Sequence, residues 1–151
     1  MKILCFVQSD ENSINPVSKE AIALSQEIKG KLNGDLDILT FNEDVANELS
    51  KYESNQVLLG KSDDLNDYNP LYYTSAIDHI LNNNEYDLLI IGHTYQARDW
   101  APRLSARRDT PFISDCIDYS IENNSIEWIR SLYRAKINSQ LKSKSKQTII
   151  S

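Results

Sequence analysis

The sequence has little glycine, proline, cysteine and histidine, and each shortage excludes something. Only four glycines and four prolines occur among 151 residues, so no long flexible linker divides the chain, and the length fits one domain with its own core. Two cysteines and two histidines provide no cluster of metal ligands at a suitable spacing. No apolar run approaches the roughly 20 residues that a membrane helix needs, and no internal repeat is present.

The N-terminal apolar run covers residues 3–7. It is too short for a signal peptide, and neither a cleavage site nor an Arg-rich leader accompanies it. We therefore expect a cytoplasmic protein with no membrane insertion. Cys5 and Cys116 lie in apolar, strand-like segments, which favours two buried reduced thiols over a disulfide.

The charge is unevenly divided along the chain. All 22 acidic residues lie at or before Glu127, where they outnumber ten basic residues and give residues 1–127 a net charge of −12. Six basic residues follow, so residues 128–151 carry +6: Arg130, Arg134, Lys136, Lys142, Lys144 and Lys146. The favoured interpretation is a solvated strand pair with protective lysines on an edge. An electrostatic contact surface is the alternative.

Strands and helices are predicted to alternate through the first three quarters of the chain. Apolar segments predict strands at 3–7, 36–41, 56–59 and 87–92, with a polar loop at 8–15. Helices are predicted to begin after Asn15 and Asn69, each followed by proline, and to cover 45–52 and about 98–108. Gly34 is predicted to be the left-handed C-terminal cap of the first helix. Pro102 is tolerable only near a helix's first turn.

The pattern changes after residue 112. Short apolar segments at 112–114, 117–122, 126–133, 137–141 and 147–150 predict strands without helices between them, and Asn123-Asn124 indicates a hairpin turn. The predicted fold is therefore α/β, a three-layer open and mostly parallel sheet with helices on both faces and a C-terminal antiparallel β extension.

Two loops follow the expected central strands, where open parallel sheets bind ligands. The loop 8–13 has no glycine and carries two acids, and no glycine follows Gly92, so neither loop offers a phosphate cradle. Arg98 is expected to form an ion pair with Asp99 or Asp115 rather than to bind phosphate. His93 is expected to be structural. No nucleophile elbow or P-loop occurs, and the tyrosines favour packing or interfaces over nucleic-acid stacking.

Several segments together resemble a known family. They are Asn15-Pro16-Val17-Ser18, Asn55-Gln56-Val57-Leu58-Leu59, Asp67-Tyr68-Asn69-Pro70-Leu71-Tyr72, Arg98-Asp99-Trp100-Ala101-Pro102-Arg103-Leu104-Ser105-Ala106, Pro111-Phe112-Ile113-Ser114-Asp115 and Arg130-Ser131-Leu132-Tyr133-Arg134-Ala135-Lys136. In this order they resemble the N-terminal domain of the electron transfer flavoprotein alpha subunit, in register from Ile3 to Ile150.

Three positions depart from the family pattern. Ala97 and Ala135 stand where the family has glycine, and Ser131 stands where it has proline, which puts the usual partner set in doubt. Alanine in place of glycine is costly where φ is positive.

The resemblance implies the fold of the adenine nucleotide alpha hydrolase-like and universal-stress-like class, with residues 1–151 as one domain. A C-terminal domain, absent from this chain, would hold most contacts to FAD. This domain would be a scaffold that docks the beta subunit of a heterodimeric electron carrier between a dehydrogenase and a downstream acceptor, without a catalytic side chain. Self-association of the isolated domain is a further expectation. The motif and interface candidates are Arg98, Asp99, Arg103, Ser114, Asp115, Arg130 and Tyr133.

Two other functions are compatible with the predicted fold. A stand-alone module binding ATP or AMP is disfavoured by the missing glycines, and micromolar binding of these nucleotides to the chain would support it. A regulatory interaction domain that lost its flavin partner would use the +6 segment, and its binding would depend strongly on salt.

Overall fold

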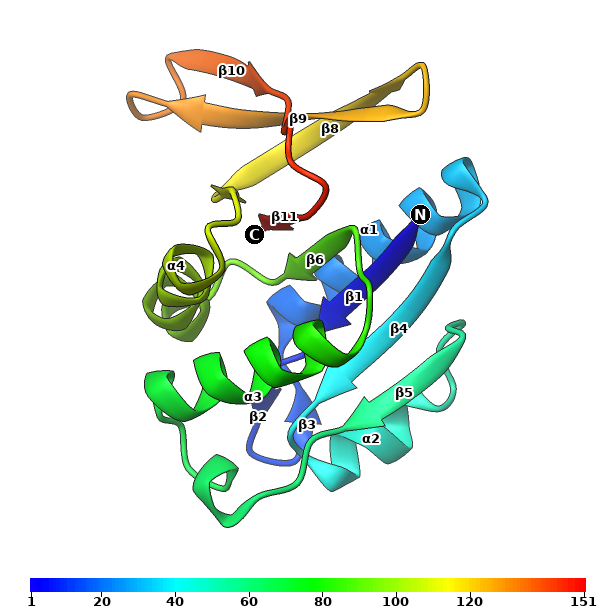
Figure 1. Ribbon diagram of the computed structural model, residues 1–151, viewed down its shortest axis with the longest axis vertical. Helices are drawn as coiled ribbons and strands as arrows, with labels where there is room; N and C mark the ends of the chain where they lie inside the picture. The colour runs from blue at the N-terminus through cyan, green and yellow to red at the C-terminus, as the bar shows by residue number, and fades with distance from the viewer.

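The computed structural model describes all 151 residues, and a six-stranded sheet forms its centre (Figure 1). Every neighbouring pair in this sheet is parallel, and the strands lie in the order β5-β4-β1-β6-β11-β7. Their bounds are Lys2–Phe6 for β1, Asp35–Thr40 for β4, Gln56–Leu59 for β5, Leu88–Ile91 for β6, Phe112–Ile113 for β7 and Thr148–Ile150 for β11. The central strand β6 is buried on both faces, as a parallel strand covered by helices on both sides should be.

Four helices cover the two faces of the sheet. They are α1 (Pro16–Leu32), α2 (Glu43–Leu49), α3 (Pro70–Asn83) and α4 (Tyr95–Arg108), with a short 3-10 turn η1 at Asp63–Leu65 before α3. Helices α1 and α2 contribute to one buried apolar cluster, and α3 and α4 contribute to a second cluster on the opposite face. This arrangement confirms the predicted three-layer α/β fold.

The two Asn-Pro helix starts are confirmed, but the predicted glycine cap is wrong. The side chains of Asn15 and Asn69 accept hydrogen bonds from backbone N–H groups in the first turns of α1 and α3. At the end of α1 the left-handed residue is Asn33, with φ of 47°. The following Gly34 has no positive φ. A Cβ there would lie 2.6 Å from the carbonyl oxygen of Met1, so this glycine allows close backbone approach.

Helix α4 begins at Tyr95, three residues earlier than predicted, and Pro102 therefore lies inside it. A proline in a helix interior removes one backbone hydrogen bond and costs about 3 kcal/mol relative to alanine. Trp100 and Leu104 hold the helix in place because both are fully buried against the sheet. Tertiary packing thus outweighs the local preference of the proline.

We call the parallel sheet with its four helices the body. The C-terminal antiparallel strands form a separate three-stranded sheet above one end of this body (Figure 1). Strand β9 (Ser125–Leu132) lies between β8 (Cys116–Glu122) and β10 (Ile137–Leu141). The turn between β8 and β9 is confirmed at Asn123-Asn124, whose φ values of 50° and 59° suit a two-residue hairpin. After β10 the chain returns to the body, and β11 inserts between β6 and β7.

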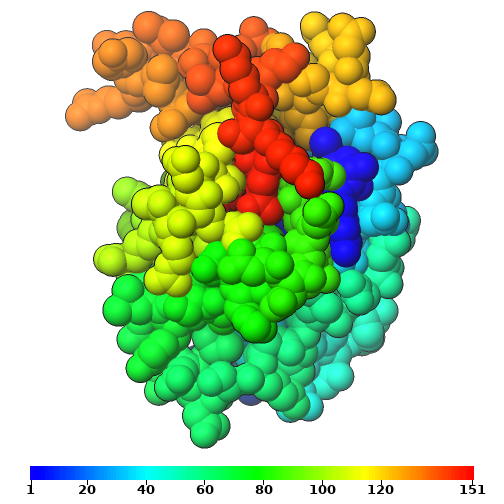
Figure 2. All heavy atoms as spheres, in the orientation of Figure 1, coloured from blue at the N-terminus to red at the C-terminus, as the bar shows by residue number.

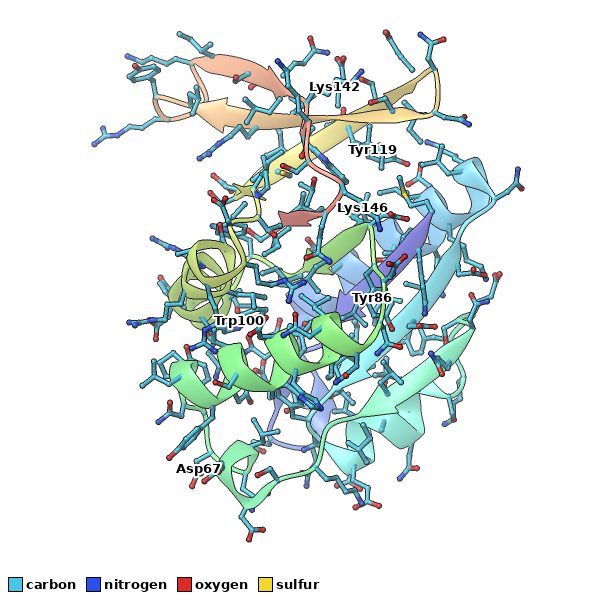
Figure 3. The ribbon with its side chains drawn as sticks, in the orientation of Figure 1. Asp67, Tyr86, Trp100, Tyr119, Lys142 and Lys146 are labelled. Atoms are coloured by element: carbon cyan, nitrogen blue, oxygen red, sulfur yellow. The ribbon has the colours of Figure 1, made fainter.

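One face of the antiparallel sheet packs on the body. Ile126 and Trp128 of β9 belong to the apolar cluster that includes α1 and α2, and Tyr119 packs against it. Figure 3 shows Tyr119 on the side of the sheet that faces the body. The two sheets therefore share one core.

The loop at 8–15 contains a structure that was not predicted. Its residues form a small hairpin from β2 (Ser9–Asp10) and β3 (Ser13–Ile14), with Ile14 buried. No helix in the structure is both long and apolar enough to cross a membrane.

Candidate functional site

The carboxyl ends of β1 and β6 flank the position at which an open α/β sheet binds its ligand. From β1 the chain proceeds to β4 on one side, and β6 lies on the other side, so the strand order reverses between them. A shallow crevice of about 540 Å³ lies there, lined by Gln8, Asn15, Val17, His93, Thr94, Tyr95, Gln96 and Arg98. We call it the switch-point crevice.

The helix N-termini beside this crevice already have partners. Asn15 Oδ1 accepts hydrogen bonds from the backbone N–H groups of Val17 at 2.9 Å and Ser18 at 3.4 Å. In α4, Thr94 Oγ1 accepts from the N–H of Ala97 at 3.1 Å. A phosphate at a helix N-terminus needs such donors free. At α1 the side chain of Asn15 occupies these donors, and at α4 Thr94 occupies the N–H of Ala97.

Gly92, which precedes the crevice residue His93, serves packing. A Cβ on Gly92 would lie 3.1 Å from the backbone carbonyl of Val17, so Gly92 allows α1 to approach the end of β6. His93 also has a structural partner, because its Nδ1 lies 2.9 Å from Ser151 Oγ. The crevice thus lacks the glycine-lined backbone that would let the diphosphate of FAD approach closely.

The motif segment 98–106 forms the middle of α4, and its pairing differs from the prediction. Asp99 pairs with Arg103 at 3.3 Å and accepts a hydrogen bond from the Tyr68 hydroxyl at 3.0 Å. Arg98 makes no ion pair with Asp99 or Asp115. Its guanidinium lies 5.7 Å from the centre of the Tyr95 ring. Asp99 therefore connects α4 to the segment before α3, and Arg98 stays exposed at the rim of the crevice.

The segment at Ser114-Asp115 is the junction between the two sheets. Asp115 has a φ of 59°, and the next residue, Cys116, begins β8 opposite Arg130 of β9. Arg130 Nε is buried and has no hydrogen-bond partner. Burial raises the pKa of the Cys116 thiol to about 11, although the charge of Arg130 opposes that rise. Both cysteines are free, as predicted.

The turn between β9 and β10 is exposed and strained. Tyr133, Arg134 and Ala135 have φ values of 52°, 58° and 62°, a region that non-glycine residues rarely adopt. Ala135 thus bears the cost expected where the family has glycine. Ala97 bears none, because it lies in the first turn of α4. The side chains of Tyr133 and Ile137 are 76% and 54% exposed.

Sequence patterns also missed residues on this exposed turn. Ile137 pairs with Leu132 in the β9–β10 ladder, and alternation along β10 places Ile137 on the same face as Leu141. Leu141 packs against the core, whereas Ile137 is exposed. The sequence predicted only a strand at 137–141, and the fold shows that the face carrying Leu141 continues beyond the body to Ile137.

Comparison with known proteins decides the family. The sequence model of the electron transfer flavoprotein domain family matches residues 3–151 of this chain. The chain belongs to the electron transfer flavoprotein family. The predicted resemblance to the N-terminal domain of the alpha subunit is confirmed by relatives of that name. Electron transfer flavoproteins are electron carriers that contain a flavin.

The relatives are longer than this chain. The electron transfer flavoprotein subunit alpha of Bacillus subtilis is 29% identical over 138 residues, which cover 89% of this chain and 42% of the relative. Protein FixB of Clostridium saccharobutylicum is 29% identical over 80% of this chain and 37% of its own length. The LctC subunit of a lactate dehydrogenase (NAD(+),ferredoxin) from Acetobacterium woodii is 24% identical over 92% of this chain and 34% of its own length. The chain thus spans about four tenths of these relatives, or less.

Proposed function

We propose that this chain is the scaffold and subunit-docking domain of an electron carrier that contains FAD. The carrier takes electrons from a dehydrogenase and passes them to a downstream acceptor. A second domain of a longer polypeptide holds the flavin, and a beta-type subunit completes the heterodimer. The protein's part in such a carrier is to bind and orient, whereas the flavin supplies the chemistry.

The observation that carries this proposal is the contrast between the switch-point crevice and the family match. The match extends over residues 3–151, yet the helix N-termini at the crevice are capped by the chain's own side chains. A domain of this family whose crevice has no glycine-lined backbone supports the flavin indirectly. The capped termini also speak against a stand-alone ATP or AMP module.

The docking surface that we propose is the hairpin end of the antiparallel sheet. We define the hairpin end as Leu132, Tyr133, Arg134, Lys136 and Ile137. Figure 2 shows the segment joining β9 and β10 (orange) projecting beyond the rest of the molecule. It combines exposed apolar side chains with two cations, whereas residues 1–127 carry a net −12. Apolar groups that continue a buried face without a partner in the chain are typical of an interface core.

The remaining candidates lie close to this surface in the chain or on α4. Arg130 belongs to β9, two residues before the hairpin end, and Ser114 and Asp115 form the junction that leads into β8. We propose that Arg130, whose Nε has no hydrogen-bond partner in the chain, donates hydrogen bonds to an acidic group of the partner subunit. Arg98, Asp99 and Arg103 form a second exposed stripe on α4, which we propose as a contact for the flavin domain.

Co-expression with the beta-type subunit of the same genome tests the proposal. Tagged chain should capture this subunit, and Ile137→Glu should weaken capture about tenfold or more, because it places a charge in an apolar interface. The matched control is Gln140→Glu, an exposed residue on the opposite face of the same strand. Capture that is absent with the unaltered chain, or equal for the two variants, would contradict the proposal.

The flavin part of the proposal has its own test. The chain of 151 residues should bind no FAD in equilibrium dialysis, whereas a polypeptide that continues into the second domain should copurify with it. Stoichiometric FAD on the short chain would place the cofactor in the wrong domain for this proposal.

A further inference from the structure

An apolar groove lies between α1 and the antiparallel sheet, away from the hairpin end. Its volume is about 320 Å³. Ala21 and Leu24 of α1 line one side, Tyr119 and Trp128 line the other, and Ile150 of β11 lies among its lining residues. We call it the α1 groove. Ligand pockets usually measure about 300–1,000 Å³ and combine apolar walls with a few polar groups.

The groove exists because the apolar stripe of α1 is wider than its contact with the body. The buried face of α1 consists of Ser18, Ala21, Ile22, Ser25 and Ile28. Val17 and Leu24 lie beside that face, remain partly exposed and line the groove. At the other rim, Ile117 sits at an irregularity in β8 and is 55% exposed. Apolar groups on both rims are therefore left uncovered by the chain.

Every charged residue that lines the groove is a carboxylate. These residues are Glu20, Glu27 and Asp118, and no lysine or arginine is among the lining residues. Glu27 is paired with Lys31 at 2.7 Å. Glu20 and Asp118 are exposed and form no ion pair within the chain. The groove therefore combines apolar walls with two carboxylates that have no cation.

The chain itself shows how a cation is held at one end of the groove. The ammonium group of Lys31 lies 4.8 Å from the centre of the Tyr119 ring and 3.0 Å from the Tyr119 hydroxyl oxygen, while Glu27 supplies the countercharge. An ammonium ion over an aromatic face with a nearby carboxylate is a favourable arrangement. Elsewhere in the groove Asp118 offers a carboxylate without a cation, and its Oδ1 accepts only a hydrogen bond from the backbone N–H of Tyr119 at 2.8 Å.

We propose that the α1 groove binds a small organic ammonium ion. The apolar part of the ligand would pack against Leu24 and Ile117, and its ammonium group would lie beside Glu20 and Asp118. The volume suits a ligand of about ten non-hydrogen atoms. At about 0.4–0.8 kcal/mol per atom, well below the ceiling for very small ligands, such a ligand binds with micromolar to millimolar affinity. This site is independent of the proposed subunit docking.

Phenethylamine, protonated at neutral pH, is the probe, and the neutral 2-phenylethanol and the anionic 3-phenylpropionate are its comparisons. Binding is measured by calorimetry and by tryptophan emission of the full chain. Trp128 lines the groove, whereas Trp100 is buried in the opposite core, so emission reports on the groove. The expected order of affinity is ammonium, then alcohol, then carboxylate, with at least about a tenfold difference between the first two.

The double variant Glu20→Gln with Asp118→Asn should reduce affinity for phenethylamine about tenfold and leave 2-phenylethanol unchanged. Glu122→Gln is the matched control, because Glu122 is an exposed carboxylate on β8 that does not line the groove. Saturation absent up to about 10 mM would overturn the proposal, as would equal affinity for the alcohol or an unaffected double variant. A third pair of results would also overturn it: the unaltered chain binds no amine, and the double variant no longer captures the beta-type subunit. The groove would then be a protein interface.

Discussion

The parallel-sheet body and the antiparallel sheet bury their strands to very different degrees. All four residues of β6 are buried, and Leu89 in β6, Cys5 in β1 and Ile38 in β4 are fully inaccessible. In β10 no residue is buried. Residues 1–127 carry a net charge of −12, whereas every charged residue after Glu127 is basic.

The difference shows which part of the domain is complete by itself. Helices cover both faces of the body, so its strands need nothing from outside the chain. The antiparallel sheet packs one face on the body through Ile126 and Trp128, and its hairpin end has no such support. A region with buried residues on one part of a face and exposed apolar residues on the next is suited to a partner.

The largest expected effect comes from separating the two regions. Trp128→Ala should lower the free energy of unfolding by about 3–5 kcal/mol, because Trp128 is only 2% exposed and joins the sheet to the shared core. Hydrogen exchange should show loss of protection in β8, β9 and β10 with protection kept in β1, β4 and β6. Uniform loss over both regions would mean that they fold as a single unit.

Trp100→Ala is the counterpart in the body. Trp100 is fully buried and packs edge-on against Phe6 at 5.3 Å, and Figure 3 shows its side chain beside α4, within the body. We expect a similar loss of about 3–5 kcal/mol, but with exchange accelerated throughout the parallel sheet. The two tryptophans thus distinguish local from global loosening.

A smaller effect is expected at a buried polar group within the body. Asp37 is 1% exposed and accepts hydrogen bonds from the Tyr86 hydroxyl at 2.7 Å and from Gln56 at 2.9 Å. Tyr86→Phe should cost about 1.5–3 kcal/mol in denaturant unfolding, because a buried carboxylate loses a donor. Burial raises the pKa of Tyr86, and the hydrogen bond to the Asp37 carboxylate raises it further. Its contribution is therefore complete below the ordinary tyrosine pKa and is lost at higher pH, so the variant should lose less stability in alkali than the unaltered chain.

The two alanine departures should respond oppositely to glycine. Ala135→Gly should stabilise the chain by about 0.5–1 kcal/mol, because φ of 62° strains alanine and suits glycine. Ala97→Gly should destabilise it by about 1 kcal/mol, because the residue is helical. Thermal unfolding measures both. The same sign for both variants would show that backbone conformation does not decide these positions.

The two thiols should differ in the rate at which a disulfide reagent labels them. Burial raises the pKa of Cys5 to about 12 and that of Cys116 to about 11, so both remain thiols well above the ordinary cysteine pKa. At about pH 8 a disulfide reagent should label Cys116 slowly and Cys5 only on unfolding. Labelling of Cys5 first would contradict the burial of β1.

Local chemistry made much of the fold predictable. The Asn-Pro pairs are sufficient to start two helices, and Asn123-Asn124 sets the hairpin turn, because each depends on neighbouring residues alone. The insertion of β11 between β6 and β7 was not predicted, since strand order depends on contacts distant in sequence. Two local roles were assigned to the wrong residue, because a nearby residue can play the same role. Arg103, not Arg98, pairs with Asp99, and Asn33, not Gly34, is the left-handed cap of α1. The exposed apolar face at Ile137 likewise became visible only in three dimensions.

The most direct test of the proposed docking role is hydrogen exchange on the complex with the beta-type subunit. Complex formation should slow exchange in residues 130–137, at the hairpin end, and leave residues 8–15 and 92–98 at the switch-point crevice unchanged. Protection confined to the crevice, with the hairpin end unaffected, would contradict the proposal that the antiparallel sheet is the docking element.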